Sequence, residues 1–349
     1  MISIDKIAKK AKVSAMTVSR VFDPRYTDKV RATTRERVLG ICKKYDYSPK
    51  YSARSLASGK TFNVGLVLND FTSGLTSPTL SLVIDSIIKE LGKYSYSLNM
   101  IYCPGNNMDE INDKILDIVY SKRVDGFLFF GEMLTKNSIE KLKKTSTPAV
   151  IVSMPSSRTL QEHVSYIHTD NHPATRDTVD HLKNIGAKKI VCIDVISSNN
   201  SCVDRTELLN REAKDAGLHT KNIICDYRYK HLQAIHDSFE WTLRNWEELK
   251  EYDAYVFSND LMAIGGVKAI ETKGLVIGRD KAIIGFDNIE ENVNYFTNEP
   301  IITTIAPPHR NLGKETAKLL IKQIGSNERK AIRLGLPSKL IIRRSSRRE

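Results

Sequence analysis

The chain lacks the segments that would place it in a membrane or direct it out of the cell. None of its 349 residues lies in an apolar run of about 18, the minimum for a transmembrane helix. The first twelve residues, MISIDKIAKKAK, are charged and have no apolar stretch of the kind found in signal peptides. We therefore expect a cytoplasmic protein with no membrane partner.

Cysteine is scarce, and known catalytic patterns are missing. The five cysteines form no C-x-x-C pair and have no histidine at zinc spacing, which favours reduced thiols and no metal site. No phosphate-binding glycine loop, G-x-S-x-G turn or Ser/His/Asp arrangement is present, so the sequence predicts neither a bound cofactor nor an enzyme. The cysteines are Cys42, Cys103, Cys192, Cys202 and Cys225.

Positive charge is present in excess, and it is concentrated at one end. The formal net charge is +12, from 53 basic and 41 acidic residues. Residues 1–60 hold 15 basic and five acidic groups, a net +10, whereas the rest of the chain is nearly balanced. A small cationic segment on a large near-neutral body indicates a nucleic-acid-binding part and a part with a different task.

Two short helices with a tight turn between them are predicted in the cationic segment. Apolar residues recur at helical spacing over 4–11, with Ser3 as a cap, and again over 15–22, with Ser14 as a cap. The three-residue connection makes this a helix-turn-helix. A third helix is expected from Thr33, where Thr33 and Glu36 form a capping-box pattern. The second helix leaves small, polar and basic side chains outward, as a reader of the major groove requires: Ala15, Met16, Thr17, Ser19 and Arg20.

Strands and helices alternate from residue 62 onward. Repeated βα units predict parallel sheets covered by helices on both faces, in two similar lobes with a crossover near 164–168. The predicted strands are 64–68, 97–102, 126–130, 149–152, 189–195, 222–225, 254–258 and 282–286. The predicted helices are 78–93, 109–121, 136–144, 172–185, 204–216, 231–246 and 260–273.

The amino-terminal residues resemble the DNA-binding head of the LacI/GalR transcription regulators. The similar stretches are IDKIAKKA at 4–11, VS at 13–14, TVSRV at 17–21, YDYSP at 45–49 and ARSL at 53–56. The resemblance implies that Ala15, Met16 and Arg20 face base edges, that Thr17 and Ser19 touch phosphate, and that Ser14 belongs to the same DNA-binding set. It also implies a hinge helix over 52–57, with Arg54 near DNA and Leu56 wedged into the minor groove.

Two features depart from that family's pattern. Lys12 stands where the family usually has glycine in the turn, and a left-handed backbone at a non-glycine residue costs about 1 kcal/mol. The loop from Asp23 to Ala32 is about two residues longer than usual. Arg25 and Lys29 in this loop are equally compatible with phosphate contacts and with a solvated loop.

The body also resembles that family, whose effector domain is similar to periplasmic sugar-binding proteins. Matching residues include SKRVDG at 121–126, SND at 258–260, GFDN at 285–288 and TTI at 303–305. The implied fold is an all-α helix-turn-helix head, a hinge helix, and an α/β periplasmic-binding-protein-like body of two parallel-sheet lobes. We expect the head at 1–48, the hinge at 49–61 and the body at 62–342. The first lobe would comprise 62–163 and 306–328, the second 164–305 and 329–342, and a basic tail at 343–349 would be disordered.

Ligands of such folds bind in the crevice at the carboxyl ends of the strands. Asp and Arg side chains there suit a polyhydroxylated ligand, because both make bidentate, charge-assisted hydrogen bonds. The alternative is that strand-end Asp and Asn residues, Asp260 in particular, only cap the following helix. His309 is expected at the surface or the rim. The predicted effector contacts are Asp70, Ser77, Arg205, Tyr227, Asn259, Asp260 and Asp287.

Together these features predict a DNA-binding transcription regulator that acts as a homodimer on a pseudo-palindromic operator. We expect this regulator to be a repressor. A small-molecule effector, a sugar or sugar derivative, would control its affinity for DNA. A purine- or nucleoside-type co-repressor is the alternative effector. Less favoured alternatives are an enzyme with a DNA-binding head and an architectural DNA binder whose lobes have lost their ligand.

Overall fold

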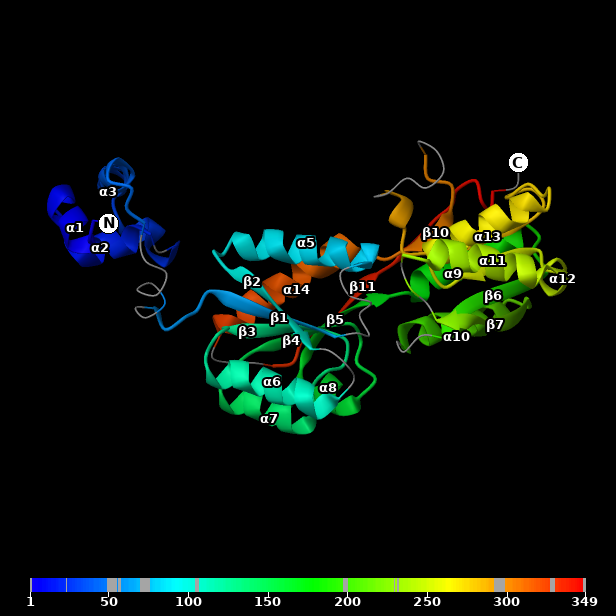
Figure 1. Ribbon diagram of the computed structural model, residues 1–349, viewed down its shortest axis with the longest axis horizontal. Helices are drawn as coiled ribbons and strands as arrows, with labels where there is room; N and C mark the ends of the chain where they lie inside the picture. Colours follow the sequence, from blue (N-terminus) through cyan, green and yellow to red (C-terminus); the bar gives the residue numbers. More distant parts are fainter. Residues whose placement is uncertain are drawn as a thin grey trace.

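The computed structural model places a helical head and two α/β lobes one after another along the long axis of the molecule (Figure 1). It describes residues 2–22, 24–48, 55, 58–69, 76–103, 107–196, 200–228, 230, 232–291, 299–326 and 330–347. Three predicted contact residues, Arg54, Leu56 and Asp70, lie outside this described part.

The head is built from three α-helices and one 3-10 helix around a small apolar core. As predicted, Ser3 and Ser14 cap the first two helices, with side-chain oxygens that accept from the amides of Lys6 and Thr17. The elements are α1 (Ile4–Ala11), α2 (Ala15–Val21), η1 (Pro24–Lys29) and α3 (Ala32–Lys44). The fully or largely buried core side chains are Ile7, Ala8, Ala11, Val18, Val21, Val38 and Cys42.

Two details of the head differ from the sequence-based expectations. The predicted capping box at Thr33 is wrong, because α3 already begins at Ala32 and its preceding residue, Arg31, makes no side-chain cap. Part of the expected loop 23–32 is helical, because η1 folds it into a compact connection. Lys12 keeps the left-handed conformation that the family's glycine would adopt, with φ of 51° and ψ of 47°.

The first lobe has a six-stranded parallel sheet in the order β11-β5-β4-β3-β1-β2. Helices α5 (Pro78–Gly92) and α14 (His309–Ile324) cover one face, and α6 (Met108–Tyr120), α7 (Lys136–Lys144) and α8 (Arg158–His163) cover the other (Figure 1). The strands are β1 (Asn63–Asn69), β2 (Ser97–Cys103), β3 (Gly126–Phe130), β4 (Ala149–Val152), β5 (Ser165–Asp170) and β11 (Arg333–Pro337).

The second lobe repeats this design with the sheet order β12-β10-β9-β8-β6-β7, in which only the β10–β12 pair is antiparallel. The strands are β6 (Lys189–Ile196), β7 (His219–Arg228), β8 (Ala254–Phe257), β9 (Ala282–Phe286), β10 (Thr303–Ala306) and β12 (Lys339–Ile341). The helices are α9 (His172–Asn184), α10 (Asn200–Asp215), α11 (Ala234–Arg244), α12 (Trp246–Leu249), α13 (Asp260–Thr272) and the 3-10 helix η4 (Ile289–Glu291).

The chain passes between the lobes three times, but two crossings lie later than predicted. The predicted crossover near 164–168 is wrong, because β5 pairs with β4 and β11 inside the first sheet. Residues 333–337 likewise belong to the first lobe, so the return to the second lobe occurs at Ser338 rather than near 329. Ser338 links two crossings, since its hydroxyl donates to Asn171 at 2.7 Å.

The expected disordered tail is also wrong for the residues that the structure describes. Ser345 and Ser346 are buried, at 1% and 0% exposure. The Ser345 hydroxyl donates to the Ile283 carbonyl and accepts from the Thr303 amide. Arg343 reaches the carbonyl of Ile302 and the side chain of Asn288. These polar groups find partners only in the second lobe, so its fold extends beyond β12.

Candidate DNA-binding and effector sites

The residues predicted to face base edges lie together on α2, and all of them except Ala15, which packs against the core of the head, are exposed. Val18 and Val21 are buried, whereas Met16, Ser19 and Arg20 are exposed. Met16 is 63% exposed, so its side chain is available for an apolar contact with a base. The helix therefore presents apolar and guanidinium groups to any duplex that the head contacts.

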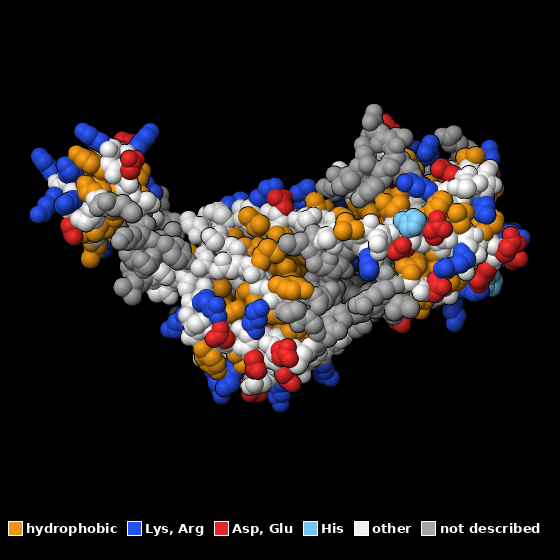
Figure 2. All heavy atoms as spheres, viewed as in Figure 1, with side chains coloured by type: hydrophobic (Ala, Val, Ile, Leu, Met, Phe, Trp, Pro, Cys, Tyr) orange, Lys and Arg blue, Asp and Glu red, His pale blue; other side chains and the backbone are white. Residues whose placement is uncertain are grey.

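The remaining predicted DNA contacts have structural tasks as well. Ser14 and Thr17 interact at the start of α2, where the two hydroxyl oxygens are 2.9 Å apart and the Thr17 amide donates to Ser14 at 3.1 Å. Ala15 is half-buried and packs against the core of the head. Lys and Arg side chains project from much of the head (Figure 2). This distribution gives phosphate groups several cations to approach.

The segment that leaves the hinge is fastened to the first lobe by Asp125. Its carboxylate accepts from the amides of Thr61 and Phe62, at 2.8 and 2.9 Å, and from the Thr61 hydroxyl at 3.0 Å. The sequence suggested Asp125 only as part of a matching stretch, with no role. This carboxylate therefore holds the segment just before β1 against the first lobe.

Arg205 and Asp287 lie near each other at the carboxyl ends of the second lobe's strands. The guanidinium carbon of Arg205 is 3.7 Å from the centroid of the Phe286 ring, and its Nη1 donates to the Ser258 carbonyl at 3.4 Å. Arg205 lies inside α10, about one turn after the helix begins, rather than at its start. Its buried Nε has no hydrogen-bond partner among the described residues, so the guanidinium retains donor capacity.

Burial raises the pKa of Asp287 to about 6. The positive charge of Arg205 acts in the opposite direction and lowers this pKa, but its effect is smaller than that of burial. The backbone of Asp287 has a φ of 104°, a region that side-chain-bearing residues rarely adopt. A carboxyl group that has a strained backbone and is largely buried next to an arginine is typical of functional sites.

A third member of this cluster, His309, was not predicted. It opens α14 of the first lobe, and its Nε2 is 3.7 Å from a carboxylate oxygen of Asp287 in the second lobe. The expectation of a surface or rim position is wrong, because only 13% of the side chain is exposed. Burial and the charge of Arg205 lower its pKa to about 4, so the ring is neutral at physiological pH. The sequence gave no indication that His309 would join this cluster, apart from its position just after the predicted passage of the chain from the second lobe to the first.

Asn259 and Asp260 have mainly structural bonds. Asn259, and not Asp260, caps α13, because its side-chain oxygen accepts from the Met262 amide at 3.0 Å. Asp260 is fully buried and accepts from the Thr304 hydroxyl at 2.7 Å and the Ile289 amide at 2.9 Å. Burial raises its pKa well above the ordinary value. Both residues nevertheless line a small pocket together with Asp287 and the first turn of α5.

The other predicted effector contacts are placed as follows. Ser77 caps α5, with its oxygen accepting from the Leu80 amide at 3.3 Å, beside the same small pocket. Tyr227 lies within β7, which extends to Arg228, and not after the strand. It is half-buried against the core of the second lobe. Arg205 and Tyr227 do not line the small pocket, so the structure brings together only part of the predicted set.

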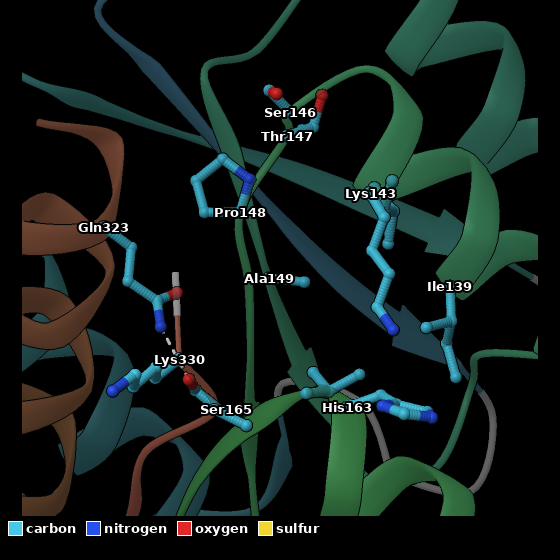
Figure 3. A pocket seen from close by; sticks show the side chains of 13 residues that line it. Ile139, Lys143, Ser146, Thr147, Pro148, Ala149, His163, Ser165, Gln323 and Lys330 are labelled. Carbon is cyan, nitrogen blue, oxygen red and sulfur yellow. Dashed lines mark hydrogen bonds between the residues drawn. The ribbon is translucent and has the colours of Figure 1, made fainter. Parts of the chain in front are cut away.

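A roomier cavity, of about 240 Å³, lies away from this crevice in the first lobe (Figure 3). It is found at the amino ends of β4 and β5, where Lys143 extends toward His163, and Gln323 donates to Ser165 at 2.6 Å. The opposite end of the sheet carries the crevice. The cavity therefore plays no part in the cluster around Asp287.

The described residues contain no group of three or more His, Cys, Asp or Glu side chains that could hold a metal ion. The four cysteines whose side chains are described are buried and unpaired, and burial raises the pKa values of Cys192 and Cys225 to about 12. Among the described residues no helix has the length and apolarity needed to span a membrane.

Comparison with known proteins agrees with this architecture. The family described as bacterial regulatory proteins, lacI family, matches residues 3–50, and a periplasmic binding protein-like domain matches residues 179–346. The transcriptional repressor PurR of Haemophilus influenzae is 29% identical in an alignment 350 positions long, which covers 99% of this chain and 98% of the repressor.

Two solved structures share the fold. The lac repressor dimer bound to operator and the anti-inducer ONPF has a TM-score of 0.76, with 22% identity and 99% of each chain covered. A complex of the transcriptional regulator CelR with cellobiose has a TM-score of 0.65, with 22% identity over 99% of this chain and 100% of that chain. With its matching head, body and full-length relatives, this chain belongs to the LacI/GalR family of effector-controlled, DNA-binding transcriptional regulators.

Proposed function

We propose that this protein is a cytoplasmic transcriptional repressor that binds a pseudo-palindromic operator as a homodimer. The observation that carries the proposal is the pairing of an exposed face of α2 with a largely buried Arg205–Asp287–His309 cluster at the crevice between two lobes. The first can contact a duplex, and the second can bind a small molecule. A lac repressor dimer on its operator has the same fold, which supports the dimeric arrangement.

The proposed effector is a sugar or a sugar derivative. A carboxylate and a guanidinium offer acceptors and donors in one place, which suits adjacent hydroxyl groups. Neutral His309 adds one donor or acceptor, depending on its tautomer. The fold neighbour CelR has been solved with cellobiose, which agrees with this class. We propose DNA-contact roles for Ser14, Ala15, Met16, Thr17, Ser19 and Arg20.

We further propose that effector binding changes the closure of the two lobes and, through the Asp125 anchor, the geometry of the hinge. Affinities for effector and operator are then coupled reciprocally, typically by about 1–3 kcal/mol. We propose no catalytic step, since the relatives that match over nearly the whole chain are named as regulators.

Isothermal titration calorimetry on the full-length protein tests the effector class. A panel of sugars, phosphorylated sugars, purines and nucleosides is titrated, and we expect binding from the sugar group. Arg205→Ala should abolish the heat of binding, whereas Arg211→Ala, an exposed arginine on the same helix, should leave it unchanged.

If only a purine binds, the proposed effector class is wrong, but the proposal that the protein is an effector-controlled regulator stands. A panel that binds equally well to the Arg205→Ala variant would contradict the assigned site. Operator affinity that stays constant as the effector saturates the protein would contradict the coupling. A monomer in sedimentation, with and without operator, would contradict the homodimer.

A further inference from the structure

The segment between α2 and α3 places an aromatic ring beside the reading helix. Tyr26, in η1, is half-buried, and the guanidinium carbon of Arg20 lies 5.2 Å from the centroid of its ring. The ammonium of Lys29 lies 5.5 Å from the same centroid. This segment is the one in which the sequence departs from the LacI/GalR pattern by about two additional residues.

The contact leaves the recognition groups of Arg20 available. A cation near an aromatic ring is attracted to the ring by its π-electrons, whereas a guanidinium recognises guanine with N–H groups in its own plane. Tyr26 can therefore hold Arg20 without occupying the donors that a base would use. An exposed arginine otherwise samples many rotamers, and this freedom is given up when it binds.

We propose that Tyr26 is a positioning residue for Arg20 and thereby strengthens the protein's choice of one base pair in each half-site. The inference rests on the proposed function, because it requires Arg20 to read a base. The ring of Tyr26, rather than its hydroxyl, carries the effect. Lys29 lies close to the same ring, so one aromatic side chain organises two cations at the edge of the reading helix.

The test begins with selection of the preferred operator from random duplexes by the full-length protein. The same selection with Arg20→Ala identifies the base pair at which the preference disappears. Binding to the preferred operator and to the duplex altered at that base pair is then measured for Tyr26→Ala, Tyr26→Phe and Tyr26→Ala/Arg20→Ala. Thermal unfolding of each variant without DNA reports whether the head remains folded.

We expect Tyr26→Ala to lower the ratio of the two affinities by about two- to fivefold. Tyr26→Phe should retain the parent ratio, because it keeps the ring. In the Arg20→Ala background, removal of the ring should change the ratio no further. A purely structural role would weaken both duplexes equally and would leave the ratio unmoved.

Two outcomes separate the inference from the proposed function. If Arg20→Ala relaxes no position of the operator, the proposed reading role of Arg20 fails. If Arg20→Ala relaxes one position but Tyr26→Ala leaves the ratio intact, the positioning role alone is overturned. The affinity ratio could also remain reduced in Tyr26→Phe, or could fall further when Tyr26→Ala is added to Arg20→Ala. Either result would show that Tyr26 contacts DNA itself and would overturn the positioning role.

Discussion

Single residues carry the chemistry of the crevice, and the sequence indicated some of them. Asp287 was indicated by a local pattern, an acid directly after an apolar strand, and Arg205 was indicated by its place in the family's sequence pattern, although it lies inside α10 and not at the predicted helix start. His309 was missed, because its partner Asp287 lies in the other lobe and only the three-dimensional fold brings the two together. The sequence suggested Asp260 as the cap of the following helix, but Asn259 caps α13 and Asp260 is fully buried. Burial decides which of the two residues caps the helix, and a strand-end pattern does not determine burial.

The raised pKa of Asp287 predicts a stability effect with a definite pH dependence. A carboxyl group with a folded pKa of about 6 binds its proton more tightly in the folded chain than in the unfolded one. Its stabilising contribution is therefore present at low pH and is lost as the pH rises through about 6. Asp287→Asn should raise the free energy of unfolding by about 2 kcal/mol at pH 7.5.

Thermal unfolding of the protein without effector checks this prediction at pH 7.5 and pH 4.5. The advantage of the variant should shrink at the lower pH, where the parent carboxyl is protonated when folded. Glu271→Gln, an exposed acid in the same lobe, serves as the matched control and should show no such gain. An equal gain at both pH values would point to relief of backbone strain instead of charge burial.

At the scale of elements, the sequence predicted the strands and helices of the first lobe well. It did not predict correctly where the first lobe ends along the chain. The strand Gly126–Phe130 and the helix Lys136–Lys144 have the predicted limits, because clear apolar runs and caps define them. β5 was assigned to the crossover instead of the first sheet, since its last three residues are only half-buried and the chain crosses directly after it. Sheet membership depends on pairing with distant strands, and no local pattern reports that pairing.

The turn of the head offers a prediction about backbone strain. Lys12 has a left-handed conformation that glycine adopts without a steric penalty. Lys12→Gly should therefore stabilise the head by about 1 kcal/mol, as followed by the loss of helical circular dichroism on heating. Lys10→Gly, within α1, is the control and should destabilise the head by about 1 kcal/mol. A decrease of stability in Lys12→Gly would contradict the argument.

The folded tail leads to a second prediction at this scale. Ser345→Ala removes an acceptor from the buried amide of Thr303 and a donor from the Ile283 carbonyl. Leaving such groups unpaired should lower the free energy of unfolding of the second lobe by about 2 kcal/mol. Both tryptophans, Trp241 and Trp246, lie in this lobe, so their fluorescence during denaturant unfolding reports the change selectively.

Arg344→Ala is the matched control for this experiment, since Arg344 is the exposed neighbour of Ser345. It should change the stability by no more than about 0.5 kcal/mol. An effect of Arg344→Ala as large as that of Ser345→Ala would contradict the assignment of the loss to the buried hydrogen bonds of Ser345. No effect of either would mean that the tail is detached in solution.

At the scale of the whole molecule, charge and fold divide the chain into the same two parts. The segment with a net charge of +10 contains the helix-turn-helix, and the nearly balanced remainder forms the lobes around the crevice. In a homodimer two cationic heads approach one duplex. Because each neutralised phosphate releases condensed counterions, operator affinity should fall steeply with salt.

If the two heads neutralise about 6–10 phosphates, affinity should decrease by roughly 10³–10⁵-fold between 50 and 200 mM salt. Lys6→Gln/Lys9→Gln in α1 should reduce the slope of log affinity against log salt by about one for each phosphate that the variant no longer neutralises. Lys143→Gln/Lys144→Gln, an equal charge change in α7 of the first lobe, is the control. If the control reduced the slope as much, the body would also bind phosphates, and the division of the chain into a DNA-binding head and a sensing body would fail.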